Sequence, residues 1–373
     1  MTRTADVVVI GGGIHGCSTA LHLALRGLKP ILVEKDYAGR HASGVNAGGV
    51  RQLARDLAEI PLSISSMDLW EHIEELVGAD CGFESHGTVL VAENDEELAS
   101  FKARVDDLRL RGFTHEELID QAELRRLVPA VSEHCPGGVV SRRDGAADPF
   151  LSTQAFRRRA IEKGAEVIEG VTVTGLARVG EVWRVETSDG PIEAPKVVNA
   201  AGAWADRIAA MLGEPVPLSV VAPMLMVTSA LPPFIQPVVI LRGRKLSFKQ
   251  RENGTVVIGG GHLATPDRDR NETVIDWDRL AISARTVWEL FPVMRQATIV
   301  RAWAGIEASM PDGIPVVGKS STSEGVFHQF GFSAHGFQLG PGTGAMMAEL
   351  VATGSTNVPI DGLEIERFRR TPT

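Results

Sequence analysis

Three glycines near the start of the chain, Gly11, Gly13 and Gly16, have the spacing G-x-G-x-x-G. In a phosphate-binding loop the first glycine permits a tight turn, the second lets the backbone approach a pyrophosphate, and the third lets a helix pack closely on a strand. Glu34 follows 18 residues after Gly16, where a carboxylate can accept hydrogen bonds from ribose hydroxyls. A glycine triplet alone also occurs in ordinary turns, so the flanking elements decide what these residues do.

The segments around these glycines have the order that a dinucleotide site requires. Residues 6–10 are a short apolar run typical of a buried parallel strand, and residues 14–26 have the pattern of an amphipathic helix. Residues 30–33 form a second apolar strand that ends at Glu34. Because the N-terminus of a helix presents free N–H groups and the positive end of its dipole, it can hold phosphates. The sequence therefore predicts an adenine dinucleotide site.

The length, composition and charge of the chain limit the protein class, the partners and the location that it can have. A chain of 373 residues with 44% hydrophobic residues and 39 glycines is typical of a globular α/β protein with two subdomains. The net charge of −9, without a basic cluster, argues against nucleic acids and anionic membrane surfaces as partners. No apolar run is long enough to span a membrane, and no signal-peptide cleavage site follows the apolar start. Three cysteines without metal-ligand spacing predict reduced thiols, no metal site and a cytoplasmic location.

Helical and strand patterns recur along the rest of the chain. Helices are expected over 60–77, 95–111, 120–127, 149–164, 277–290 and 342–353, and strands over 87–92, 171–173, 181–185 and 192–198. Residues 220–260 contain β-branched runs separated by prolines, which predicts a mostly antiparallel sheet. Signals of a nucleotide-binding unit return near residue 200 and after residue 310. We therefore expect a nucleotide-binding domain over 1–85, 140–218 and 305–373, and an inserted substrate domain over 86–139 and 219–304.

Five motifs extend over nearly the whole chain. They are GGGIHG (11–16) with Glu34, RHASGVNAGGVRQ (40–52), VVNAAGAWAD (197–206), RAWAGIEASMPDGIPVVG (301–318) and GFSAHGFQLGPGTGAMMAEL (331–350). Together they resemble the FAD-dependent D-amino acid oxidase, glycine oxidase and sarcosine oxidase superfamily, which includes β subunits of opine oxidase and proline dehydrogenase. The resemblance implies an α/β fold with a Rossmann-like FAD-binding domain of the glutathione-reductase type. The inserted substrate domain would be α+β, built on a mostly antiparallel sheet.

The resemblance also implies how FAD is held. The glycine loop and Glu34 would bind its ADP half, residues 43–49 would run along the flavin, and residues 336–343 would close over the ring where the last helix begins. Backbone N–H groups there can stabilise negative charge on the reduced flavin. The implied FAD-binding residues are Gly11, Gly13, Ile14, His15, Gly16, Glu34, Lys35, Ser43, Asn46, Ala47, Gly48, Gly49, Val173, Ala201, Gly202, Trp204, Gly305, Gly336, Phe337, Gln338 and Leu339.

Several positions depart from the pattern of that superfamily. Gly305 stands where some covalent flavoenzymes carry a cysteine and Asn46 where others carry a histidine, so the resemblance implies noncovalent FAD. Ile258 stands where sarcosine oxidase carries an oxygen-activating lysine, so a rapid direct reaction with oxygen is not implied. Glu307 stands at an arginine position of glycine oxidase, and the one tyrosine, Tyr37, belongs at the adenosine end. The usual arginine–tyrosine clamp for a substrate carboxylate is therefore missing.

Five residues are candidates for the chemistry by the same resemblance. Arg51 matches an arginine that binds a substrate carboxylate; its alternative role is a salt bridge or phosphate contact within the flavin loop. His262 matches an active-site histidine that can take a proton from an ammonium; otherwise it is an ordinary residue at a strand end. Glu307 would face either the flavin, where it would attract an ammonium, or the solvent. Gln338 stands where sarcosine oxidase carries a carboxylate-binding lysine. His335 would lie beside the flavin and act either as a positioning residue or as a base.

Two lysines occupy a predicted strand of the inserted domain. Alternation over residues 244–249 would place Lys245, Ser247 and Lys249 on one face, opposite Arg244, Leu246 and Phe248. We interpret that face as solvated, with a role in the substrate cavity as the alternative.

These residues lead to one expected function and its alternatives. The chain is expected to oxidise the C–N bond of a small amino acid or N-substituted amino acid, such as glycine, sarcosine, an N-carboxymethyl amino acid or an opine. A hydride would pass to flavin N5, the imine would hydrolyse, and O2 would be reduced to H2O2. One alternative is a β subunit of a hetero-oligomeric dehydrogenase that passes electrons to a partner protein; another is a D-amino acid oxidase or dehydrogenase. A homo-oligomer stays open as well, and a flavin-binding redox sensor is the weakest hypothesis.

Overall fold

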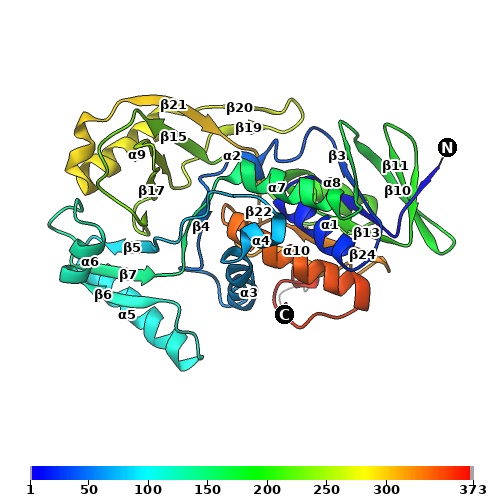
Figure 1. Cartoon of the computed structure of the whole chain (residues 1–373), viewed down its shortest axis with the longest axis horizontal. Helices are drawn as coiled ribbons and strands as arrows, with labels where there is room; N and C mark the ends of the chain where they lie inside the picture. The colour runs from blue at the N-terminus through cyan, green and yellow to red at the C-terminus, as the bar shows by residue number, and fades with distance from the viewer. Residues whose placement is uncertain (1, 370–373) are drawn as a thin grey trace.

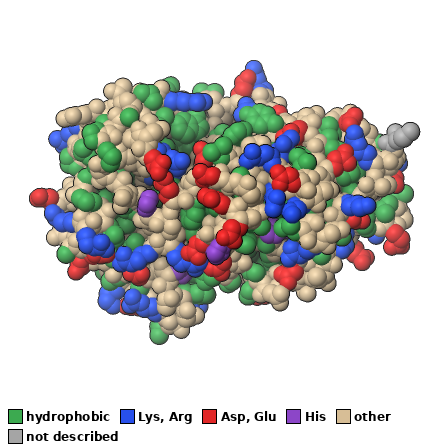
Figure 2. Space-filling view, viewed as in Figure 1, with side chains coloured by type: hydrophobic (Ala, Val, Ile, Leu, Met, Phe, Trp, Pro, Cys, Tyr) green, Lys and Arg blue, Asp and Glu red, His purple; other side chains and the backbone are tan. Residues whose placement is uncertain are grey.

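The computed structural model describes residues 2–369, which form two neighbouring lobes, each built on one large sheet (Figure 1). We call them the six-strand lobe and the eight-strand lobe after the number of strands in those sheets. Lys and Arg side chains alternate with Asp and Glu side chains over the face drawn in Figure 2. None of the helices described between residues 2 and 369 is both long and apolar enough to cross a membrane.

The six-strand lobe has the strand order β23-β24-β13-β2-β3-β9. The strands are β2 (Val7–Ile10), β3 (Pro30–Glu34), β9 (Glu166–Glu169), β13 (Lys196–Asn199), β23 (Val316–Lys319) and β24 (Val326–Phe330). All neighbours are parallel except β23, which runs antiparallel to β24. In β2, Val7 and Val9 belong to the core beneath the helices, while Val8 and Ile10 pack in a separate core with Trp183. Burial on both faces explains why this strand is apolar without alternation.

Helices cover one face of this sheet and a smaller sheet covers the other. The helices of the lobe are α1 (Ile14–Leu25), α2 (Ala42–Val45), α3 (Ile60–Trp70), α4 (Ile73–Val77), α7 (Pro149–Glu162), α8 (Ala205–Met211) and α10 (Gly336–Thr353), with short 3-10 turns η1 (Gly202–Trp204) and η3 (Ile365–Phe368). Helix α10 packs between α1 and α3. The smaller sheet contains β1 (Arg3–Thr4), β12 (Ile192–Ala194), β11 (Val182–Thr187) and β10 (Val173–Val179).

The eight-strand lobe has the order β21-β15-β18-β17-β16-β5-β7-β6. The strands are β5 (Thr88–Ala92), β6 (Glu117–Asp120), β7 (Gly137–Ser141), β15 (Met224–Thr228), β16 (Val238–Leu241), β17 (Leu246–Gln250), β18 (Val256–Gly259) and β21 (Ile299–Ala304). Only the pair β5–β16 is parallel among these described strands. Further elements of the lobe are α5 (Asp95–Leu110), α6 (Gln121–Leu127), α9 (Trp277–Leu290) and η2 (Pro292–Gln296).

Short strand pairs connect the two lobes. These are β4 (Gly49–Val50) with β8 (Gly145–Ala146), and β14 (Ser219–Val221) with β22 (Glu307–Ser309). A third pair, β19 (Thr265–Asp267) and β20 (Glu272–Val274), forms a hairpin that extends from the eight-strand lobe toward the other lobe (Figure 1). Its tip bonds to the loop before α8 and to α8 itself, as described below.

Two helices differ from the sequence-based expectation. The helix expected over 60–77 is divided into α3 and α4. The last helix begins at Gly336 rather than at residue 342 and contains Pro341, which interrupts its hydrogen-bond ladder. Side chains of α3 replace the lost bonds: Ser66 and Trp70 donate to the Gln338 carbonyl at 2.5 and 2.8 Å, and Ser66 Oγ accepts from the Gly342 N–H at 2.9 Å. A proline can therefore stand inside this helix because a neighbouring helix satisfies its backbone.

Candidate cofactor-binding and active site

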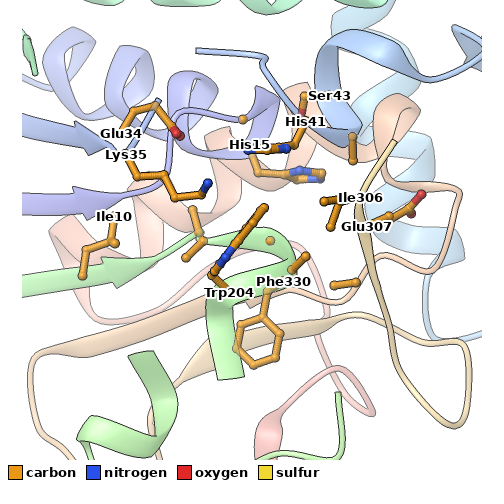
Figure 3. Close-up of a pocket in the computed structure, with 18 of the residues that line it drawn as sticks. Ile10, His15, Glu34, Lys35, His41, Ser43, Trp204, Ile306, Glu307 and Phe330 are labelled. Carbon is orange, nitrogen blue, oxygen red and sulfur yellow. The ribbon is translucent and has the colours of Figure 1, made fainter. Parts of the chain in front are cut away.

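A cavity of about 300 Å³ runs through the six-strand lobe, and its walls come from segments far apart in sequence. Glu34 and Lys35 lie at one end, and Ile306 and Glu307 lie at the other (Figure 3). We call these the Glu34 end and the Glu307 end. The carboxyl ends of the parallel strands β2 and β3 open into this cavity, which is where α/β sheets bind ligands.

The glycine loop packs its backbone against neighbouring backbone. Gly11 has a φ of 111°, and a Cβ there would collide with the Ala200 carbonyl. A Cβ on Gly16 would overlap the Gly11 carbonyl, so the third glycine sets the distance between helix and loop. No side chain of Gly13, the N-cap residue, covers the first turn of α1. Ile14 N–H donates to Ser43 Oγ at 2.9 Å, which links this turn to helix α2.

Glu34 is held at the end of β3 by two backbone groups. Its carboxylate accepts from Gly12 N–H at 2.6 Å and from Asp36 N–H at 2.9 Å. Burial raises its pKa, and these two bonds partly oppose that effect. Lys35 Nζ lies 3.9 Å from the ring centroid of Trp204 and donates to Asn271 of the β19–β20 hairpin at 2.9 Å. The Glu34 end thus combines an acid, an aromatic ring and a cation.

The hairpin β19–β20 is fastened to residues around the cavity. Arg268 donates to the Ala203 carbonyl at 2.7 Å and forms a bidentate pair with Asp206 at 2.7 and 2.9 Å. Arg207 pairs with Asp269. Ala203, Arg207 and Lys35 all line the cavity, so the hairpin joins the eight-strand lobe to the cavity wall near the Glu34 end.

The Glu307 end is mostly apolar and contains two polar side chains, a buried histidine and a half-buried glutamate. His15 is stacked on Phe332 with ring centroids 3.6 Å apart, and its Nε2 has no hydrogen-bond partner among the described residues. Burial lowers the pKa of His15 to about 3, so its imidazole is neutral. Glu307 is half-buried and accepts a hydrogen bond from Ala334 N–H. Burial raises the pKa of Glu307 to about 7, although the Ala334 bond acts in the opposite direction.

A buried polar network lies beside the cavity, outside its lining. Gln338 is fully buried; its Oε1 accepts from Arg55 and from Ser63, each at 3.0 Å, and its Nε2 donates to the Ser63 carbonyl at 2.8 Å. His335 Nε2 lies 2.7 Å from Glu59 Oε1, and the Arg51 guanidinium donates to the Leu53 carbonyl. These side chains hold the segment 51–63 and the start of α10 together.

The structure places the predicted catalytic residues in different surroundings. Glu307 lines the cavity, whereas Arg51, His335 and Gln338 belong to the network beside it. His262 lies outside the lining, and burial together with Lys245 and Arg279 lowers its pKa. Gln338 is not presented to a substrate, because its side chain is fully buried and both its amide oxygen and its amide nitrogen bond within the folded chain.

The predicted cofactor-binding residues divide in the same way. Fourteen of them line the cavity: Gly11, Gly13, Ile14, His15, Glu34, Lys35, Ser43, Asn46, Val173, Ala201, Gly202, Trp204, Gly336 and Phe337. The cavity lining does not include the other seven, which are Gly16, Ala47, Gly48, Gly49, Gly305, Gln338 and Leu339. Gly16 and Gly305 act through packing, since a Cβ on Gly305 would collide with Val45. Residues that the sequence analysis missed include Arg40, His41, Arg207, Met211, Ile306 and Phe332, and for most of them no spacing signal exists.

The interpretation of a solvated strand face is wrong for Lys249, whereas Lys245 on the same face is exposed. Only 4% of the Lys249 side chain is exposed, and Nζ has no hydrogen-bond partner among the described residues. Burial lowers its pKa to about 7. The amine lies next to Gly48, where a Cβ would come within 3.0 Å of Nζ. Alternation places Lys249 on the predicted face, but at this position the segment around Gly48, rather than water, lies against the side chain.

The donor set of the cavity fits an adenine dinucleotide. Glu34 is positioned for ribose hydroxyls, the start of α1, whose N-cap Gly13 has no side chain, for phosphates, and the apolar Glu307 end for a planar ring. The unpartnered His15 Nε2 at the wall of the cavity leaves one buried polar atom for a bound group.

Comparison with known proteins agrees with this fit. Residues 6–350 match the family model "FAD dependent oxidoreductase". The chain is 30% identical over 398 residues to the mitochondrial sarcosine dehydrogenase of Homo sapiens, covering 100% of this chain and 42% of that protein. It is 28% identical over 376 residues to sarcosine oxidase subunit beta of Rhizobium meliloti (strain 1021), covering 98% and 88%. The chain thus spans less than half the length of the sarcosine dehydrogenases that it matches.

A solved structure shows the same architecture along the whole chain. L-proline dehydrogenase from P. horikoshii superimposes with a TM-score of 0.92 at 30% identity, covering 99% of each chain. The expected fold class, an α/β FAD-binding fold with a mostly antiparallel second sheet, is confirmed. The expected superfamily and its FAD cofactor are confirmed as well. The chain belongs to the family of FAD dependent oxidoreductases.

Proposed function

We propose that this chain uses FAD to oxidise the C–N bond of an amino acid or N-substituted amino acid. The main support is the cavity that continues from the Glu34 end to the apolar Glu307 end, in a chain whose relatives are a sarcosine dehydrogenase, a sarcosine oxidase subunit and an L-proline dehydrogenase. The names of those relatives concern secondary amines, which favours that substrate class here.

Residues at the two ends of the cavity would have different roles in the reaction. Glu34 and the start of α1 would hold the ribose and the phosphates, and Gly336 and Phe337 would bound the ring. FAD, when bound, supplies the acceptor for the two electrons and the hydrogen that leave the carbon next to nitrogen. Apolar side chains such as Ile306 and Phe332 would exclude water from that step. Gly305 and Asn46 cannot form a covalent bond to FAD, which supports a noncovalent cofactor.

The test is an anaerobic titration of the purified protein with glycine, sarcosine, D-alanine, D- and L-proline, an N-carboxymethyl amino acid and an opine. Bleaching of the visible flavin absorption by the N-substituted members is the expected result. If none of these amines bleaches the flavin, the proposal fails. If glycine and D-alanine bleach it and the secondary amines do not, the D-amino acid alternative is correct.

A second candidate is a β subunit that passes electrons to a partner protein. It is supported by the alignment that covers 88% of a sarcosine oxidase subunit beta. Air admitted after anaerobic bleaching distinguishes the two: rapid recovery of the absorption indicates an oxidase, and persistent bleaching indicates a missing acceptor. The cytoplasmic location also stays a prediction, supported by three cysteines that are each buried and unpaired.

A further inference from the structure

Two acids line the cavity within residues 2–369, and they lie at opposite ends. Glu34 is bonded to backbone at one end; Glu307, on β22, lies at the other beside Ile306 (Figure 3). Strand β22 is fixed by antiparallel pairing, in which Glu307 lies opposite Val221. The backbone position of Glu307 is therefore set by strand pairing.

Within residues 2–369, the one hydrogen bond to this carboxylate comes from an unusual stretch of backbone. Ser333 and Ala334 both have positive φ angles, 50° and 66°, although neither is a glycine. Ala334 N–H donates to Glu307 Oε1 in this conformation. Successive left-handed residues with a Cβ are costly and concentrate at functional sites. The backbone before α10 thus orients the Glu307 carboxylate without supplying a charge.

The titratable groups on the elements around Glu307 supply no positive charge to pair with its carboxylate. His335 before α10, His15 in α1 and His41 before α2 all have a lowered pKa because they are buried, to about 3 for His15 and about 4 for His41. They are neutral near pH 7. Arg51 and Arg55 face His335 and Glu59, and Glu59 accepts from His335. Within residues 2–369, two effects act on the pKa of Glu307: burial raises it and the hydrogen bond from Ala334 lowers it.

We infer that Glu307 is the catalytic residue that takes the proton from the substrate ammonium before the C–N bond is oxidised. An N–H bond of the ammonium breaks, an O–H bond forms on Glu307, and the nitrogen keeps the electron pair; no electrons are transferred in this step. A carboxyl with a pKa of about 7 is suited to this exchange near neutral pH. The substrate class follows: an ammonium that carries at least one N–H, so that quaternary ammonium compounds are excluded. This inference rests on the proposed function.

The first test uses sarcosine at concentrations well below saturation and follows flavin bleaching anaerobically between pH 5.5 and 10. In the wild type, the second-order rate should rise about tenfold per pH unit up to pH 7 and then level off. In Glu307→Gln the rise should continue toward about pH 10, where an alkylammonium itself loses its proton. The rate at pH 7 should fall by about 100-fold or more. Glu307→Asp should keep the rise of the rate that ends near neutral pH, with lower rates throughout. Glu181→Gln changes a residue on an exposed turn and should match the wild type.

A second readout needs no turnover. Methoxyacetate has the shape of sarcosine but an ether oxygen in place of the N–H group, so it should bind best when Glu307 is protonated. Its dissociation constant, measured by perturbation of the flavin spectrum, should rise about tenfold per pH unit above 7 in the wild type and stay constant in Glu307→Gln. Identical pH profiles in both proteins would overturn the inference alone. Failure of sarcosine and of every other amine tested to bleach the wild-type flavin would overturn the proposed function and this inference with it.

Discussion

Gly16 has no room for a side chain, because a Cβ there would overlap the Gly11 carbonyl of the phosphate loop. Gly175 in β10, in contrast, has room for a Cβ, whose nearest neighbours would be side-chain carbons of Glu186 at 3.6 and 3.7 Å. We expect Gly16→Ala to push α1 away from the loop, to lower the free energy of unfolding by about 1–3 kcal/mol and to reduce FAD content. Urea unfolding and the ratio of flavin to protein absorption measure both effects. Gly175→Ala is the control; a Gly16→Ala protein with full FAD content and an unchanged unfolding midpoint would contradict the prediction.

Asp144 gives a prediction about pH. Its buried carboxylate accepts from Gln52 N–H at 2.8 Å, Leu53 N–H at 3.1 Å and Ser141 Oγ at 2.8 Å, and burial raises its pKa to about 6. The folded state then holds a proton that the unfolded state has lost, so this residue makes the free energy of unfolding fall as pH rises from about 4 to 6. The shift corresponds to at most about 3 kcal/mol.

The Asp144→Asn variant removes that titration. Its unfolding free energy at any single pH will be lower, because an amide cannot accept from both backbone N–H groups. The difference between wild type and variant should therefore shrink as pH rises from 4 to 6, measured by urea unfolding at each pH. A difference that stays constant or grows over this range would show that Asp144 titrates normally.

At the scale of elements, the hairpin β19–β20 is expected to retain the cofactor. The Arg268–Asp206 pair is bidentate and partly buried, and it fastens the hairpin to the segment that carries Ala203 and Trp204. We expect Arg268→Ala to raise the rate of FAD release several-fold, since such a pair contributes on the order of 1 kcal/mol. Release is measured by the fluorescence of free FAD after dilution. Arg126→Ala, which breaks the exposed pair with Glu123, is the control; equal release rates in the two variants would exclude this role.

The sequence was informative about elements that obey local rules. The strand 6–10, the helix after the glycine loop and the helix that Asp120 caps all form where the patterns predict them, and Asp120 accepts from Glu123 N–H at 2.9 Å. The start of α10 was mispredicted because Pro341 depends on Ser66 and Trp70 of another helix. Lys249 was misplaced because alternation identifies a strand face without identifying what packs on it.

The candidate site was predictable to the extent that it consists of motifs. Glu34 and the glycine loop depend on residue types at fixed spacing, and they line the cavity. Arg207 and Met211 reach the same cavity from α8 through tertiary packing, which no spacing encodes. The internal bonds of Gln338 likewise depend on Arg55 and Ser63, which are distant in sequence. Position in a motif therefore predicts which residues lie near the cavity. Hydrogen bonds to distant residues determine which of those side chains can still contact a ligand.

At the scale of the whole molecule, FAD should stabilise the fold by binding segments that lie far apart in the chain. A free FAD concentration about 100 times its dissociation constant adds about 2.7 kcal/mol to the free energy of unfolding. For a chain of 373 residues with an unfolding entropy of about 0.8 kcal/mol/K, this raises the Tm by roughly 3 °C. Thermal unfolding of FAD-depleted protein, with and without added FAD, measures the change. An unchanged Tm, with riboflavin as the matched control ligand, would contradict binding at this cavity.

The distribution of the cavity walls along the chain has a consequence for biosynthesis. Lining residues begin at Ile10 and continue to Phe337. At a translation rate of about 5–20 residues per second, roughly 16 to 65 s separate the synthesis of the first wall from that of the last. The glycine loop emerges from the ribosome early, but the other walls of the cavity have not yet been synthesised during that interval. Cofactor loading is thus a late event in the life of each new chain, and a shortage of flavin would act on molecules that have already been fully translated.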